Sequence, residues 1–101
     1  MLLILFLLAL SALSSPAQTT APSGPAFFDS TVKPILRNNC YACHTDRNLT
    51  SGLSLQTREA ILRGGNRGNP TQTLLSAIRH TADLKMPPGK KLAPEQIATL
   101  E

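Results

Sequence analysis

The chain has 101 residues, with ten basic and six acidic side chains and a formal net charge of +4. This length allows one small domain and no more. The basic residues are scattered and are not interleaved with aromatic residues, as nucleic-acid binding requires, so we expect no nucleic-acid partner. The aromatic fraction of 4% and the absence of Trp indicate a core that side chains alone do not fill.

The N-terminal residues have the pattern of a targeting signal. An apolar run from Leu2 to Leu13 is followed by small residues. The run is shorter than the roughly 20 apolar residues of a transmembrane helix and fits the centre of a secretory signal peptide. We predict residues 1–17 to be that peptide, with cleavage after Ala17. An uncleaved anchor or a buried helix are the alternatives. After cleavage we expect no stable membrane span, and export to the periplasm or an equivalent compartment.

Residues 18–25 are polar, small and rich in proline, which predicts a flexible linker. The domain is expected to cover residues 26–101. Its apolar runs have helical spacing, and none alternates for long. The predicted fold class is therefore all-α, with several short helices and loops around one cofactor.

The first predicted helix leads directly to the first cysteine. Its apolar stripe has helical spacing: Phe28, Val32, Ile35 and Leu36. We expect it to start near Pro25, capped by Ser23 or Gly24, and to end at Asn39. Pro34 should kink or split it, because proline lacks an N–H and clashes with the preceding turn.

Three more helices are expected further along the chain, over residues 57–63, 71–80 and 94–101. Thr57 and Thr71 are the predicted caps of the first two. The loop before them carries three leucines that could cover the edge of a cofactor: Leu49, Leu53 and Leu55.

The stretch Cys40-Tyr41-Ala42-Cys43-His44 reads C-x-x-C-H, the spacing for covalent attachment of a c-type haem. Each thiol can bond one vinyl group of the same porphyrin, and His44 can reach the iron as the proximal ligand. Tyr41 is expected to pack near the haem edge.

The two cysteines could instead form a disulfide, a redox dithiol or part of a zinc site. A redox dithiol is typical of a βαβ setting, and a zinc site needs a second pair of ligands, which the sequence does not supply. A structural disulfide stays possible in an exported protein, but it does not account for the adjacent His44.

Met86 is the one methionine left after signal cleavage, and it stands before Pro87 and Pro88 in a stiff segment. Cytochromes c with histidine and methionine axial ligands use such a sulfur. We predict Met86 as the distal ligand and His80 as its rival. Three basic residues could pair with haem propionates: Arg63, Arg67 and Lys85.

Taken together, these residues resemble the cytochrome c domain at the N-terminus of large planctomycete-type secreted proteins, a mono-haem, class I-like cytochrome. The matching stretches are residues 32–36, 39–44, 52–55, 57–65, 76–78, 85–88 and 94–97. The resemblance covers residues 26–101. It implies one covalent haem c on Cys40 and Cys43, axial ligands His44 and Met86, and electron transfer outside the cytoplasm.

Similar domains continue beyond this point, whereas here the last helix stops at Glu101. We therefore expect an N-terminal piece of a longer protein, with a weakened contact between its first and last helices. Its partner would be a redox protein or a fused downstream domain.

The leading hypothesis is an electron-transfer module that is not itself an enzyme, since both axial positions are filled. The alternatives are a haem-based sensor or peroxidase-like site with a labile sixth ligand, and a haem-free disulfide interaction domain.

Overall fold

The structure is a computed structural model that describes residues 14–18 and 21–101. Most of the predicted signal peptide and part of the predicted linker lie outside these residues, so both stay predictions. Within the described ranges the chain forms helices and loops, and its β contact is one isolated antiparallel bridge between His44 and Leu49. The all-α prediction is confirmed. None of the described helices has the length and apolar character needed to cross a bilayer.

The first helix runs from Gly24 to Asn39 in three consecutive segments: α1 (Gly24–Phe27), a π-helical turn (Phe28–Val32) and α2 (Lys33–Asn39). Pro34 lies in the first turn of α2, where its missing N–H is tolerated. A π-helical turn directly precedes α2, and the backbone keeps helical φ and ψ from one segment to the next. Ser23 is at the N-cap as predicted, although its side chain makes no capping hydrogen bond.

The later helices are α3 (Arg58–Arg63), α4 (Pro70–Arg79) and α5 (Pro94–Leu100), and a short 3-10 turn covers Thr50–Gly52. Thr57 caps α3 as predicted, since its hydroxyl accepts a hydrogen bond from the Ala60 amide at 3.1 Å. The cap of α4 is different from the predicted one: Asn69, not Thr71, accepts the Gln72 amide at 3.0 Å. Pro70 then fills the first helical position, so α4 begins one residue earlier than expected.

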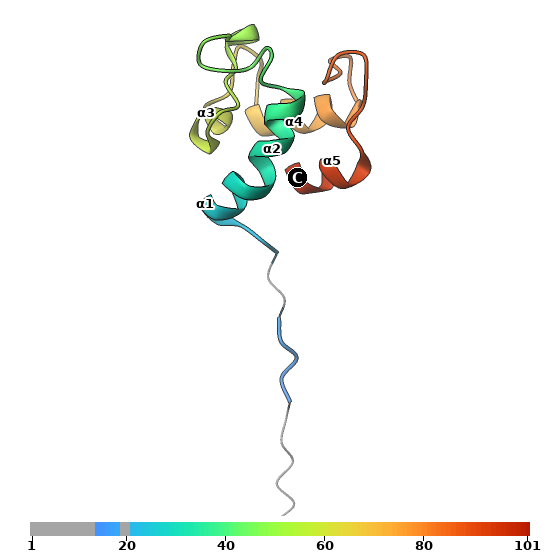
Figure 1. The fold of residues 1–101 in the computed structure, drawn as a ribbon. Coiled ribbons are helices and arrows are strands. Elements are labelled where there is room, and N and C mark those ends of the chain that lie inside the picture. The colour runs from blue at the N-terminus through green and yellow to red at the C-terminus, as the bar shows by residue number, and fades with distance from the viewer. Residues whose placement is uncertain (1–13, 19–20) are drawn as a thin grey trace, which may run out of the picture.

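Two of the helices pack on α4. Both α3 and α5 contact α4, and α5 also contacts the π-helical turn of the first helix. Figure 1 shows α2 between α3 and α5, with the C-terminus beside α2. The contact between the first and last helices, which was expected to be weakened by the short last helix, is therefore present.

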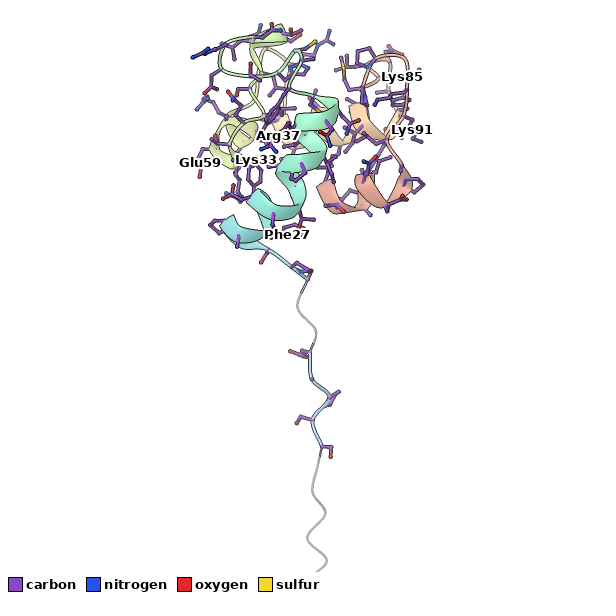
Figure 2. The ribbon with its side chains drawn as sticks, viewed as in Figure 1. Phe27, Lys33, Arg37, Glu59, Lys85 and Lys91 are labelled. Atoms are coloured by element: carbon purple, nitrogen blue, oxygen red, sulfur yellow. The ribbon has the colours of Figure 1, made fainter. Side chains whose placement is uncertain are left out.

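Among the described residues the core is small and consists of six almost fully buried apolar side chains: Leu36, Leu55, Ala60, Ala77, Ile78 and Leu92. Charged side chains such as Glu59, Lys85 and Lys91 lie at the surface (Figure 2). Three of the six core residues, Leu55, Ala77 and Ile78, also form walls of a cavity, so the centre of the domain and this cavity share their apolar lining.

Candidate functional site

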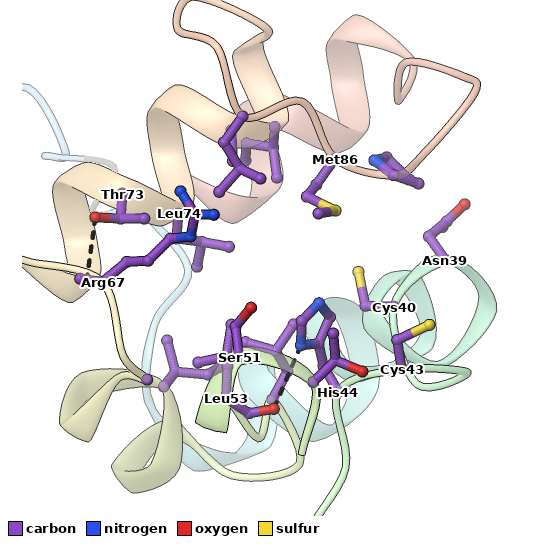
Figure 3. A pocket seen from close by; sticks show the side chains of 18 of the residues that line it. Asn39, Cys40, Cys43, His44, Ser51, Leu53, Arg67, Thr73, Leu74 and Met86 are labelled. Atoms are coloured by element: carbon purple, nitrogen blue, oxygen red, sulfur yellow. Dashed lines mark hydrogen bonds between the residues drawn. The ribbon is translucent and has the colours of Figure 1, made fainter. Parts of the chain in front are cut away.

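A cavity of about 450 Å³ opens between α4, the C-terminal end of α2 and the loop after it. Its volume is within the range of about 300–1,000 Å³ of pockets for cofactors and small ligands. All four residues predicted to hold a cofactor line it: Cys40, Cys43, His44 and Met86. Figure 3 shows the Met86 thioether pointing into the cavity from one side and the His44 ring from the other.

The end of α2 places the two cysteines and the histidine together. The Cys40 amide donates to the Leu36 carbonyl at 2.8 Å, which closes the last turn of the helix. The amides of Cys43 and His44 both donate to the Cys40 carbonyl, at 3.2 and 3.0 Å. Because this tight turn folds residues 40–44 back on themselves, the three side chains reach the same cavity.

The His44 ring is oriented by a backbone group. Its Nδ1 makes a long hydrogen bond of 3.4 Å to the Leu53 carbonyl. A carbonyl only accepts, so Nδ1 carries the proton and Nε2 of the neutral ring keeps its lone pair for a metal. Metal-binding histidines commonly have such a partner on their other nitrogen. The sequence analysis missed this role of Leu53. Every residue has a backbone carbonyl, so the residue type does not show which one faces His44.

The environment of Cys40 favours the neutral thiol. Burial raises the pKa of Cys40 from 9.0 to about 11, with a smaller opposing effect from the Lys90 charge. A thiol of that kind is a poor source of thiolate, the form that binds zinc and attacks disulfides. The two cysteines are free, and within residues 14–18 and 21–101 no three Cys, His, Asp or Glu side chains gather as a metal site would need.

Met86 is held through its backbone by the end of α4. Its amide donates to the Ala77 carbonyl at 3.0 Å, and its own carbonyl lies 3.2 Å from Nε2 of His80. His80, the predicted rival ligand, is not among the residues that line the cavity. The His80 ring instead forms a hydrogen bond with the backbone carbonyl of Met86, the residue with which it was expected to compete for the iron.

Of the other residues predicted to lie near the cofactor, some line the cavity and some do not. Leu53 and Leu55 line the cavity, but Leu49 does not and is 52% exposed. Arg67 is the one predicted propionate partner at the cavity. Arg63 and Lys85 lie elsewhere, while Lys90, which the sequence analysis did not single out, is part of the lining.

Tyr41 packs beside the site without lining it, and its hydroxyl donates to the Leu55 carbonyl at 3.3 Å. On another wall, the backbone N–H of Asn66 donates to the Ser51 carbonyl at 2.8 Å. The backbones approach so closely there that a Cβ on Gly65 would overlap the Ser51 carbonyl oxygen. This contact joins the loop that carries Leu53 to the segment after α3.

Comparison with protein families gives one matching family model. The family model described as Planctomycete cytochrome C matches residues 40–90, half of the chain. The chain belongs to the planctomycete cytochrome c family. The matched residues run from Cys40 past Met86, so they include all four residues predicted to hold the cofactor. No curated protein and no solved structure matches the chain.

A cytochrome c family implies a haem cofactor, and the chemistry of the cavity fits one. A haem attached through a C-x-x-C-H motif would need two thiols for the porphyrin vinyl groups and a nitrogen ligand for the iron. The cavity offers Cys40 and Cys43, a His44 ring with Nε2 available, and the thioether of Met86. Its other walls are largely apolar, as a porphyrin face requires, and include Leu55, Leu74 and Ile78.

Proposed function

We propose that this chain is an electron-transfer module with one covalently attached haem c, held by Cys40 and Cys43 and ligated by His44 and Met86. The observation that carries the proposal is the convergence of these four side chains on one largely apolar cavity. When bound, the haem supplies an iron that cycles between the ferrous and ferric states.

Cys40 and Cys43 would attach the group without any change of oxidation state. Each thiol would add across one vinyl double bond, with the sulfur bonding to one carbon and the thiol hydrogen going to the other. A neutral Cys40 thiol, as its raised pKa implies, already carries the hydrogen that this addition needs. A separate maturation system outside the cytoplasm would carry out the attachment, in agreement with the predicted signal peptide.

His44 and Met86 would bind the iron from opposite sides. The Leu53 carbonyl keeps Nε2 of His44 free for the metal, and the bonds to Met86 hold its backbone at the cavity wall. If both residues bind the iron, they would leave no coordination site open to a substrate, so we propose a carrier rather than an enzyme. Its partner would be a redox protein or a fused domain of a longer chain.

The proposal is tested on protein expressed with a cytochrome c maturation system. We expect the haem to stay on the polypeptide after denaturation and extraction with acidic organic solvent, and to be lost from a Cys40→Ser, Cys43→Ser double variant. Extraction of the haem from the unmodified protein would contradict covalent attachment.

The axial ligands are tested by comparing the unmodified protein with Met86→Ala. The substitution should remove the red absorption band of methionine bound to ferric iron and lower the reduction potential, because a thioether ligand raises it. Rapid carbon monoxide binding by the unmodified ferrous protein would instead favour a sensor with a labile sixth ligand.

A further inference from the structure

His80 ends α4 in an unusual backbone conformation. Its φ and ψ are 59° and 36°, in the left-handed region, which is uncommon for a residue other than glycine, although His is among the more tolerant residues. The chain reverses here: the His80 amide donates to the Ala77 carbonyl, and the Thr81 amide donates to the Ser76 carbonyl at 3.1 Å. This reversal turns the following segment back along α4.

The reversal brings the imidazole of His80 to the backbone of Met86. Nε2 of His80 lies 3.2 Å from the Met86 carbonyl oxygen, and because that oxygen only accepts, Nε2 is the donor. On its other side the Met86 amide donates to Ala77 at 3.0 Å. Both polar backbone groups of Met86 are thus bound to the last turn of one helix, one by a main-chain group and one by a side chain.

We propose that His80 is a positioning residue for Met86: its ring holds the Met86 backbone so that the thioether stays at the cavity. This inference rests on the proposed role of Met86 as an axial ligand. A methionine side chain has three rotatable bonds, so fixing its backbone limits how far the sulfur can withdraw from a bound iron. The His80 ring does this without itself lining the cavity.

The expected size of the effect follows from one hydrogen bond. A typical hydrogen bond contributes about 0.5–1.5 kcal/mol net, or about a 2- to 12-fold change in an equilibrium. Loss of the His80 bond should weaken the binding of Met86 to iron by that factor. An added ligand that must displace Met86 should then bind more tightly by the same factor.

The test uses the haem-loaded protein and three substitutions of His80. His80→Gly removes the ring and adopts positive φ without strain, so the helix end is kept. His80→Asn also tolerates this conformation but is too short to place a donor where Nε2 lies. His80→Gln can place an amide N–H near that position, and serves as the conservative rescue.

Two properties are measured: imidazole binding to the ferric protein and the methionine–iron absorption band. We expect imidazole to bind about fivefold more tightly to His80→Gly and His80→Asn than to the unmodified protein, with a weaker band in both. His80→Gln should stay within about twofold of the unmodified protein. The urea concentration at the midpoint of unfolding, measured for each variant, separates this effect from a general loss of stability.

Each contrary result overturns the inference in a recognisable way. If His80→Gly and His80→Asn bind imidazole as weakly as the unmodified protein, while Met86→Ala loses the band, Met86 is the ligand but His80 does not position it. If Met86→Ala leaves the spectrum unchanged, the proposed ligation itself fails. If in addition His80→Gly alters the spectrum, His80 is a ligand and not a positioning residue.

Discussion

At the scale of single residues, the site depends on backbone groups as much as on the side chains that define the motif. The orientation of His44 rests on the Leu53 carbonyl, and the placement of Met86 rests on Ala77 and His80. These partners are nine, nine and six positions away in the sequence. The atoms that could bind a metal, the His44 nitrogen and the Met86 sulfur, could be predicted from the residue types. The groups that orient these two residues could not, because they depend on how the loops fold back.

Cys40 provides a prediction at this scale. In a Cys43→Ala variant it is the single thiol. Burial raises the pKa of Cys40 from 9.0 to about 11, so in the folded, haem-free chain the thiolate at pH 8 should be about 100-fold scarcer than in a thiol of pKa 9.0. Alkylation by iodoacetamide, followed by mass spectrometry, should be slower in buffer than in urea by about that factor.

The pH dependence of this reaction has a defined direction. The raised pKa means that the rate for folded Cys40 keeps rising with pH until about pH 11, whereas the rate in urea levels off near pH 9.0. Equal rates in buffer and in urea at pH 8 would show that the thiol is not buried as the structure has it.

At the scale of elements, helices were predicted well and their ends less well. The spacing of apolar residues identified the first helix and the three later ones, because that pattern depends on neighbours three and four positions apart. The caps depend on the geometry of the preceding loop. Thr57 was predicted correctly, but in α4 Pro70 occupies the first helical position, which leaves the cap to Asn69 instead of Thr71.

The cap of α4 can be tested directly. Asn69→Ala removes the acceptor of the Gln72 amide and should lower the free energy of unfolding by about 1 kcal/mol. The matched control is Thr71→Ala, an exposed position two residues further on, where alanine favours the helix and no loss is expected. Urea titration of the haem-loaded protein measures both. A larger loss for Thr71→Ala than for Asn69→Ala would show that Thr71 is the cap.

At the scale of the whole molecule, a small core and the cavity share their apolar residues. Small domains often depend on a metal or another added group, because they bury little apolar surface of their own. Leu55, Ala77 and Ile78 belong both to the core and to the cavity wall. A bound haem would therefore pack directly on the core, and we expect stability and haem attachment to be linked.

Leu36 tests how much of the stability this core supplies. It is 1% exposed, and Leu36→Ala should lower the free energy of unfolding by about 2–5 kcal/mol through lost burial and the cavity left behind. Leu62 is the matched control, since it is 48% exposed and Leu62→Ala should change stability by no more than about 0.5 kcal/mol. The measurement is urea unfolding of the haem-loaded variants. Similar losses for the two leucines would mean that α2 does not pack as described.

The sequence alone determined the all-α class, the position of most helices and the four candidate residues for holding a haem, because residue chemistry and local spacing carry that information. Only the tertiary structure decided that these four side chains meet at one cavity, that Arg67 and Lys90 lie there while Arg63 and Lys85 do not, and that His80 binds the Met86 backbone. These facts depend on contacts between segments distant in the chain. Such contacts arise from the packing of whole helices and the reversal at the end of α4, which no local pattern encodes.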